Sequence, residues 1–409
     1  MEDGAWNTAP RSGVSSGMRV LFTTTGGAGH VGPLLPFARA LRAAGHAVLG
    51  AVRRSPATTD AAVVAAGLPV RDVDDAPPEP RASVFAQASG MTTDRANALV
   101  VGEIFAGIDA PAALPGIQAA IEEWRPDVLV HESCEFAGPL AAERAGVPIV
   151  HVPIALAASD ELLGPSAIPA IARMRDRLGL PEGPPPGWHE SRPVLTLTPP
   201  SLEDPAAPGP AHIRRFRDDE APAGALPNWW GGREEPLVYL TFGSVAPTMP
   251  FFPGLYRGAI AALAGLPVRV LVTVGRTQDP AALGPLPGNV HAERWVPQAD
   301  VAPHAAAIVD HGGFGTVRAA VSAGIPQVVL PLFADQPYNA RRVTDLGAGI
   351  ALESGPAAVT ALGDAIERVL GDPSYAAAAA RVAAEARALP APAGAVDVIA
   401  DLAATAAAA

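Results

Sequence analysis

The stretch that decides the fold is residues 295–349, which read WVPQADVAPHAAAIVDHGGFGTVRAAVSAGIPQVVLPLFADQPYNARRVTDLGAG. A short apolar run, Ala305–Val309, leads into His311 and the glycine-rich loop Gly312–Gly315, and a helix is expected from there to Ala323. Three glycines within four positions allow the backbone to turn sharply and to approach a ligand closely. This is the pattern of a strand, a ligand-binding loop and a helix.

The residues around this loop predict an anion site beside a hydroxyl-binding site. Thr316 can cap the following helix, whose free N–H groups and positive dipole end favour a diphosphate, and His311 can donate one more hydrogen bond. A second apolar run, Gln327–Leu330, is followed by Asp335 and Gln336. In an open α/β sheet, ligands bind at the edge where such strands end. Together these features predict a nucleotide-sugar site.

The whole segment resembles the donor-binding signature of family 1 glycosyltransferases of the GT-B fold. The matching features are the opening WxPQ, the HGGxGT loop, the GxP of Gly324–Pro326 and the closing DQxxNA. The resemblance implies that Trp295 stacks near the nucleotide base and that Asp335 and Gln336 hold sugar hydroxyls. It also implies that His311 and the loop backbone hold the diphosphate. The donor site implied in full comprises Ser244, Trp295, Val296, Gln298, His311, Gly313, Phe314, Gly315, Thr316, Asp335 and Gln336.

One departure from the family pattern bears on the donor. Members that use UDP-sugars usually carry a Glu on the helix after the glycine loop, and it holds both ribose hydroxyls. The matching position here is Ala319. Because a thymidine nucleotide lacks the 2′-hydroxyl, it would lose least from that change. The expected donor is therefore a dTDP-deoxysugar, with a UDP-sugar as the alternative.

Composition limits the possible functions. The chain has 409 residues, 49% of them hydrophobic, and a net charge of −12, which disfavours binding to nucleic acid or to an anionic membrane. All 29 basic side chains are Arg, so Schiff-base lysine chemistry and a Walker-A lysine are excluded. The single cysteine, Cys134, can form neither an internal disulfide nor a cysteine-based zinc site. No HExxH motif or paired Cys/His cluster is present, so we expect no bound metal and no cofactor besides the donor.

The amino-terminal part contains a second glycine-rich loop. The apolar run Met18–Thr24 predicts a buried parallel strand, and Gly27, Gly29 and Gly32 then form a literal G-x-G-x-x-G. A dinucleotide-binding loop expects an acid at the end of the second strand, but that strand ends in Arg53 and Arg54, which could suit only an NADP 2′-phosphate. An NADP-dependent oxidoreductase is therefore a weaker alternative.

The same loop also resembles the acceptor-side GHxxP motif of the glycosyltransferase family, in which the His is the catalytic base. This reading assigns the role to His30. Imidazole, with an unperturbed pKa of about 6.5, can take the proton of an acceptor hydroxyl near neutral pH. An acid that binds the other ring nitrogen would fix the tautomer. Glu132 follows the predicted strand Val128–Val130 and is the favoured partner, with His131 and Glu135 as neighbouring candidates.

These features predict two Rossmann-like, doubly wound α/β domains of the GT-B type, facing each other across a cleft. The expected divisions are a disordered leader 1–17, an acceptor domain 18–205, a linker 206–235, a donor domain 236–390 and a carboxyl-terminal helix or tail 391–409. That last helix either braces the first domain or is a solvated tail. A strand is expected at Arg192–Thr198 and a helix at Ala357–Leu370.

The expected function is inverting, metal-independent transfer of a deoxysugar to a hydrophobic natural product such as a polyketide. A sterol or lipid acceptor, and a GT-B-shaped auxiliary protein without activity, stay open. The first 17 residues contain no apolar signal region and no apolar run reaches membrane-spanning length, so a cytoplasmic protein is expected. The oligomeric state is left open, a homodimer included.

Overall fold

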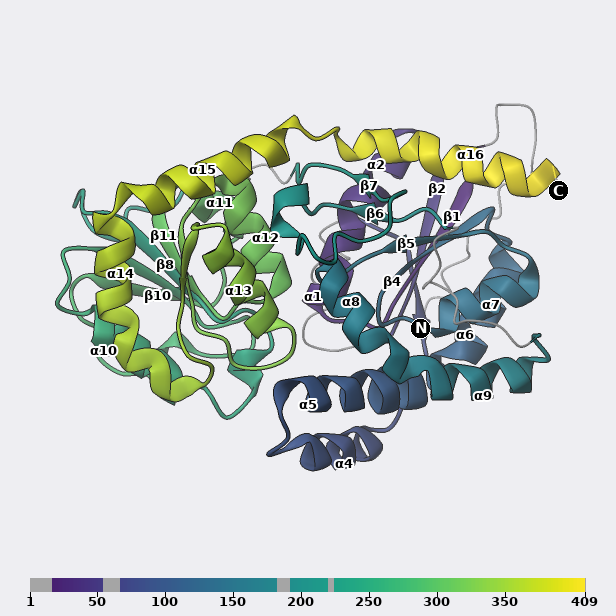
Figure 1. Cartoon of the computed structure of the whole chain (residues 1–409), viewed down its shortest axis with the longest axis horizontal. Helices are drawn as coiled ribbons and strands as arrows, with labels where there is room; N and C mark the ends of the chain where they lie inside the picture. Colours follow the sequence, from purple (N-terminus) through teal and green to yellow (C-terminus); the bar gives the residue numbers. More distant parts are fainter. Residues whose placement is uncertain (1–16, 54–66, 182–191, 220–223, 409) are drawn as a thin grey trace, which may run out of the picture.

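The computed structural model describes residues 17–53, 67–181, 192–219 and 224–408. Within these ranges the chain forms two α/β units side by side, each built on a parallel sheet (Figure 1). The predicted fold class is confirmed. The predicted leader lies outside the described residues except for Gly17.

The first sheet has the strand order β3-β2-β1-β4-β5, and all neighbouring strands are parallel. Successive side chains of a strand point to opposite faces. Leu21 therefore packs with helices on one face, and Val20 and Phe22 pack on the other. The strands are β1 (Arg19–Thr24), β2 (Ala47–Arg53), β3 (Val70–Val73), β4 (Val128–Glu132) and β5 (Ile149–Val152).

Helices cover both faces of this sheet, as a doubly wound fold requires. Buried residues of α6, α7 and α9 meet one face, and those of α2 and α16 meet the other. The helices of the first unit are α1 (Ala28–Val31), α2 (Leu35–Ala43), α4 (Pro78–Ala88), α5 (Thr93–Leu99), α6 (Ala110–Trp124), α7 (Ala137–Ala145), α8 (Ala157–Leu163) and α9 (Ile168–Leu178), with 3-10 turns η1 (Gly32–Leu34) and η3 (Gly164–Ala167).

The second sheet repeats this plan with the strand order β10-β9-β8-β11-β12-β13, again parallel throughout. Helices α10 and α14 pack on one face, and α12 packs on the other. The strands are β8 (Leu237–Thr241), β9 (Arg269–Thr273), β10 (Val290–Glu293), β11 (Ala305–Asp310), β12 (Gln327–Val329) and β13 (Gly349–Ala351). The helices are α10 (Gly254–Leu263), α11 (Gln298–Val301), α12 (Phe314–Ala323), α13 (Gln336–Asp345), α14 (Leu362–Gly371) and α15 (Pro373–Ala388), with 3-10 turns η5 (Ala246–Thr248), η6 (Pro280–Leu283), η7 (Ala302–His304) and η8 (Pro356–Ala361).

Several segments differ from the sequence-based expectation. The strand expected at Arg192–Thr198 is reduced to β6 (Leu195–Thr196), which pairs only with β7 (Arg214–Arg215) in a separate small sheet. The helix expected at Ala357–Leu370 starts as the 3-10 segment η8 (Pro356–Ala361) and becomes α-helical only at Leu362.

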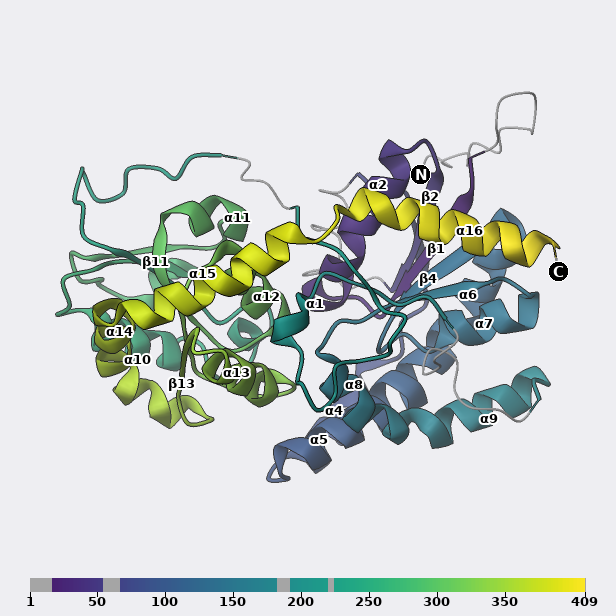
Figure 2. The ribbon, with the colours of Figure 1, turned by 45° about the horizontal axis from the view of Figure 1, so that its top comes forward.

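The carboxyl terminus crosses back from the second unit to the first. Helix α15 lies along the second unit, and α16 (Ala395–Ala408) lies along the first after the short turn η9 (Pro392–Gly394), as Figure 2 shows. Ile399 is fully buried in the apolar cluster that contains Phe37 and Val150. Of the two readings left open, the helix braces the first unit.

Residues 93–124 form one continuous helical stretch through α5, η2 (Val100–Asp109) and α6. By length and composition this stretch could cross a membrane. Its residues Ala106, Ile117 and Ile121 instead pack in the core against the first sheet. The segment η2 is a π-helix, a rare conformation that occurs often at functional sites.

The packing of α16 against the first unit leads to a prediction about stability. Ile399→Ala removes a fully buried side chain from the core that α16 shares with the first sheet. Such truncations destabilise by about 2–5 kcal/mol. We expect the urea midpoint of the first unit, followed by circular dichroism, to fall accordingly. Thr405→Ala, at an exposed position of the same helix, is the control and should leave the midpoint nearly unchanged; equal effects of both changes would mean that α16 does not brace the unit.

Candidate active site

One large cleft, about 1990 Å³ in volume, is lined by residues of both units. It collects the carboxyl ends of strands from both sheets, where the loops after β1, β4, β5, β8 and β11 begin. His30 lines it from the first unit, and His311, Trp295 and Asp335 line it from the second. All the sequence-predicted donor residues and His30 therefore face one space.

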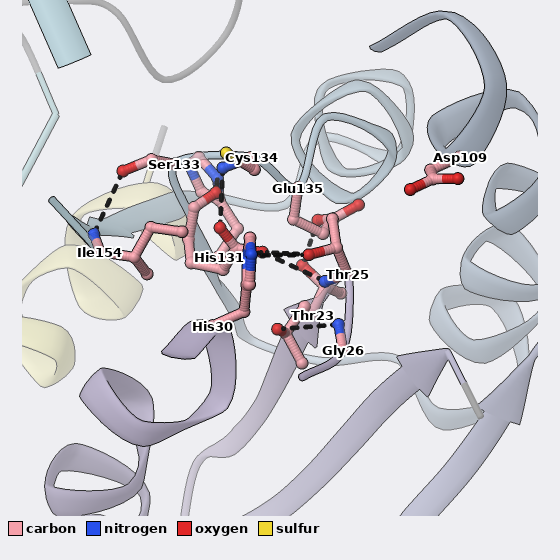
Figure 3. A network of polar contacts seen from close by, with 12 residues as sticks. Thr23, Thr25, Gly26, His30, Asp109, His131, Ser133, Cys134, Glu135 and Ile154 are labelled. Carbon is pink, nitrogen blue, oxygen red and sulfur yellow. Dashed lines mark hydrogen bonds and ion pairs between the residues drawn. The ribbon is translucent and has the colours of Figure 1, made fainter. Parts of the chain in front are cut away.

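His30 and Glu132 are in direct contact. The turn after β1 continues into α1, which carries His30, and Glu132 is the last residue of β4, the strand beside β1. The His30 Nδ1 atom lies 3.0 Å from Glu132 Oε1 and 2.9 Å from Thr25 Oγ1 (Figure 3). The predicted neighbours Glu135 and His131 are buried elsewhere: Glu135 caps α7 through Gly138 N–H, and His131 contacts a backbone carbonyl.

The surroundings of the pair keep Glu132 ionised. Burial alone would raise the pKa of Glu132, but attraction to His30 and hydrogen bonds from His30, from Cys134 N–H and from Thr25 N–H lower the pKa to about 2. Glu132 is therefore ionised at all working pH values and accepts the Nδ1–H of His30. That tautomer leaves Nε2 of His30 free to accept a proton, which is the requirement for a general base.

Two further residues touch this pair, and neither contact was predicted from the sequence. Thr25 donates its hydroxyl proton to Glu132 Oε1 over 3.0 Å. Phe105, on the π-helix, places its ring 5.4 Å from the His30 ring at a tilt of 54°. The position of Thr25 at the end of β1 was a signal available in the sequence, whereas nothing in the sequence indicated the π-helix that turns Phe105 toward His30.

Among the described residues, a single cluster could approach a metal ion. His30, Glu132 and Cys134 offer ligand atoms within 4.8 Å of one another. Burial, followed by repulsion from nearby carboxylates, raises the pKa of Cys134 and keeps it a thiol. The three residues of this cluster belong to the first unit.

His311 occupies a slot between two glycines on the donor side. A Cβ on Gly243 would lie 2.6 Å from its ring, and one on Gly313 would lie 2.5 Å from it. Burial lowers the pKa of His311 to about 4, so the imidazole is neutral at pH 7. Its Nδ1 has no hydrogen-bond partner among the described residues. That Nδ1 atom is buried, so a ligand in the cleft would meet the neutral imidazole through another part of the ring.

The first turn of α12 lines the cleft beside His311. The prediction that Thr316 caps this helix was wrong, because Gly313 is the cap residue and Thr316 lies inside the first turn. Gly313 has the extended backbone of an ordinary cap residue, with φ of −62° and ψ of 132°. Thr316 instead accepts a hydrogen bond from Gln298 Nε2 at 3.2 Å, which ties the predicted base-side loop to the helix.

Some of the hydrogen-bonding groups of Asp335 and Gln336 already have partners within the protein. Gln336 Oε1 accepts from the N–H groups of Leu332 and Phe333 at 2.8 and 2.9 Å, which leaves its NH2 group for a ligand. Asp335 accepts from Asn339 at 2.8 Å, and burial raises its pKa. Ala334, just before the pair, has a left-handed backbone with φ of 56°. Its carbonyl accepts a 2.9 Å hydrogen bond from Asn97 of α5, in the other unit.

Trp295 is 47% exposed and is covered by a residue that sequence reasoning missed. The Arg276 guanidinium carbon lies 3.6 Å from the centroid of the Trp295 ring. Val296 packs at the edge of the apolar cluster under Tyr239, and Ser244 lines the cleft after β8. Arg276 follows the end of β9, and that position was the available signal.

Little in the structure supports the alternative, an NADP site at the amino-terminal glycine-rich loop. Arg53, the residue proposed for a 2′-phosphate, forms ion pairs with Asp109 and Asp75. Part of the amino-terminal glycine-rich loop forms helix α1, and His30 of that helix contacts Glu132.

Comparisons with known proteins identify the family. Residues 39–163 match the family described as "Erythromycin biosynthesis protein CIII-like, N-terminal domain", and residues 258–402 match its C-terminal counterpart. The chain is 35% identical over 387 residues to "L-demethylnoviosyl transferase" of Streptomyces niveus, which covers 92% of this chain and 96% of that protein. The chain belongs to this family. It is a natural-product glycosyltransferase of the GT-B fold.

Solved structures agree with this membership. The glycosyltransferase SnogD from Streptomyces nogalater superposes with a TM-score of 0.75 at 30% identity, over 95% of this chain and 100% of that one. The glycosyltransferase SsfS6 of Streptomyces sp. SF2575, complexed with thymidine diphosphate, superposes with a TM-score of 0.74 at 29% identity, over 94% and 99%.

A buried acid in this glycosyltransferase gives a pH prediction. Asp310, at the end of β11, is fully buried, and its Oδ1 accepts from Gly312 N–H at 2.6 Å. Burial raises its pKa to about 7. Between the unfolded value, about 4, and pH 7 the folded state holds one proton more than the unfolded state, so its stability falls as pH rises.

Asp310→Asn removes this cost and keeps the acceptor oxygen. The variant should therefore gain at least about 1 kcal/mol in unfolding free energy relative to the parent at pH 8, and little at pH 4.5. Urea unfolding at both pH values measures the difference. Asp364→Asn, at an exposed position, is the control. A gain that is the same at both pH values would contradict the raised pKa.

Proposed function

We propose that this glycosyltransferase moves a deoxysugar from a dTDP-linked donor to a hydroxyl group of a hydrophobic small molecule, with inversion and without a metal ion. One observation carries the proposal: the His30–Glu132 pair and the His311–α12 anion site face each other across a single cleft. A base on one side and a leaving-group site on the other suit a single in-line displacement, which inverts the anomeric centre.

On the acceptor side, His30 Nε2 takes the hydroxyl proton as the oxygen attacks. Glu132 holds Nδ1–H and stabilises the imidazolium that forms, because its own low pKa keeps it ionised throughout. The apolar part of the acceptor lies against the side chains of α4, α5 and η2 in the cleft. Phe85 of α4 and Met91, in the turn between α4 and α5, are 57% and 44% exposed, which is unusual for large apolar residues and fits a site for a hydrophobic ligand.

On the donor side, the diphosphate lies at the start of α12. The N–H groups of its first turn, the neutral His311 and Ser244 meet the charge that develops on the leaving group. Asp335 and the NH2 group of Gln336 contact sugar hydroxyls, and Trp295, Val296 and Gln298 surround the base.

Two observations favour a thymidine nucleotide. Ala319 lines the cleft on α12 and offers no carboxylate to a ribose 2′-hydroxyl. SsfS6, which superposes over nearly the whole chain, binds thymidine diphosphate.

Calorimetric titration with dTDP, UDP and NADPH tests the donor. We expect the parent protein to bind dTDP several-fold more tightly than UDP, to bind in the presence of EDTA, and to show no saturable binding of NADPH. Ala319→Glu should move the preference toward UDP, because the new carboxylate can hold a ribose diol. Tight binding of NADPH alone would refute the transferase assignment, and an unchanged preference in the variant would refute the argument from Ala319.

Substitutions at the two histidines separate chemistry from binding. His30→Ala should lower kcat by about 10²–10⁴ while dTDP affinity stays within twofold, because a general base supplies that factor. Glu132→Gln, which keeps the shape and loses the charge, should also lower kcat. His311→Ala should chiefly weaken dTDP binding. Steady-state kinetics and calorimetry give both quantities, and loss of dTDP binding in His30→Ala would count against its assignment.

A further inference from the structure

A second polar cluster lies in the acceptor half of the cleft, beside the His30–Glu132 pair. It consists of Ser133, which directly follows Glu132, together with His151 at β5 and Asp160 in α8. All three line the cleft. Figure 3 shows Ser133 on the far side of the network from Thr25, next to Ile154.

A donor and an acceptor can be assigned to each hydrogen bond of this cluster. Ser133 Oγ donates its only proton to Asp160 Oδ2 over 2.8 Å. It therefore accepts from Ile154 N–H at 3.3 Å and from His151 Nε2, which lies 3.2 Å away and must carry a hydrogen. His151 is held in place by stacking on His131, with ring centroids 5.0 Å apart. Asp160 is the last acceptor in this series of hydrogen bonds.

The surroundings of Asp160 keep it neutral. No ion pair with an Arg is found for it among the described residues, and the charged groups that act on it are the carboxylates of Glu203, Glu132 and Asp335. Burial, reinforced by these acids, raises its pKa to about 8. Because Oδ2 is occupied by Ser133, the carboxyl proton belongs on Oδ1. Asp160 is half-buried and part of its surface is open to the cleft.

We propose that Asp160, oriented by Ser133 and His151, binds an oxygen of the acceptor other than the reacting hydroxyl, and that this oxygen is a hydrogen-bond acceptor such as a ketone carbonyl. The inference rests on the proposed function, since it places the acceptor beside His30. Glu132 and Ser133 are consecutive residues at the end of one strand. The two oxygens of the acceptor therefore lie on the same edge of the molecule.

The chemical class follows from the lining of this part of the cleft. Ile154, Leu163 and Phe105 give the cleft an apolar wall here, and Ser159 and Glu203 are further polar residues that line it nearby. A neutral O–H donor in an apolar wall discriminates against a ligand that leaves it unpaired. The acceptor is thus a hydrophobic hydroxylated ring system with a carbonyl group, rather than a saturated hydrocarbon alcohol such as a sterol.

Two probes that differ in a single oxygen test the subsite: 2-hydroxy-9-fluorenone, which carries a carbonyl, and 2-hydroxyfluorene, which does not. Binding is followed by quenching of tryptophan fluorescence in the full-length protein with dTDP present. We expect the ketone to bind about three- to tenfold more tightly, the range of one buried neutral hydrogen bond. Asp160→Ala should abolish this preference.

Asp160→Asn is the decisive variant, because an amide still accepts from Ser133 and still donates an N–H toward the cleft. It should keep the preference for the ketone. Glu161→Gln, at the exposed neighbouring acid, should keep it as well. Failure of both probes to bind, equal binding of both by the parent, or an Asn variant that behaves like the Ala variant would overturn the proposal. Because dTDP binding is measured independently, failure of the transferase assignment itself would be seen separately.

Discussion

A carboxylate sealed from water determines how the active site of this protein is built. Glu132 is fully buried, and an isolated charge in such a place would be prohibitively costly. It is tolerated because His30, Thr25 and the Cys134 N–H all donate to it. Those donors come from the loops after β1 and β4, which are neighbours in the sheet. The order of strands, the turn that carries His30 and the tautomer of its ring are thus linked to one negative charge.

The two sides of the cleft differ in the charged groups that they contain. The acceptor half uses an ion pair whose acid is always ionised, which suits a base that must become positive for a moment. The donor half holds His311 neutral in an uncharged slot between Gly243 and Gly313 and relies on backbone N–H groups. Such fixed dipoles do not need to reorganise when a leaving diphosphate gains charge. A neutral slot also avoids the cost of a buried cation before the donor arrives.

Much of this architecture could be predicted from the sequence, because apolar runs and the glycines at the turns between them are local signals. The parallel strands β1, β11 and β12 were predicted within one residue at each end, and Glu132 could be named because the ends of neighbouring parallel strands meet. The failures depend on tertiary context. Thr316 looks like a cap, but the helix already begins after Gly313. The π-helix carrying Phe105, and Arg276 over Trp295, are set by packing between segments far apart in the sequence.

The hydrogen bond from Asn97 to the carbonyl of Ala334 has a consequence for protein engineering. The left-handed backbone of Ala334 is unfavourable for a residue with a side chain, by about 1 kcal/mol. Part of the support for that conformation comes from the opposite unit. If Asp335 and Gln336 bind the sugar as proposed, sugar selectivity is not a modular property of the second unit. A chimera that joins this half to a foreign acceptor half would inherit the nucleotide preference, whereas its choice of sugar would depend on whether the new α5 supplies an equivalent donor.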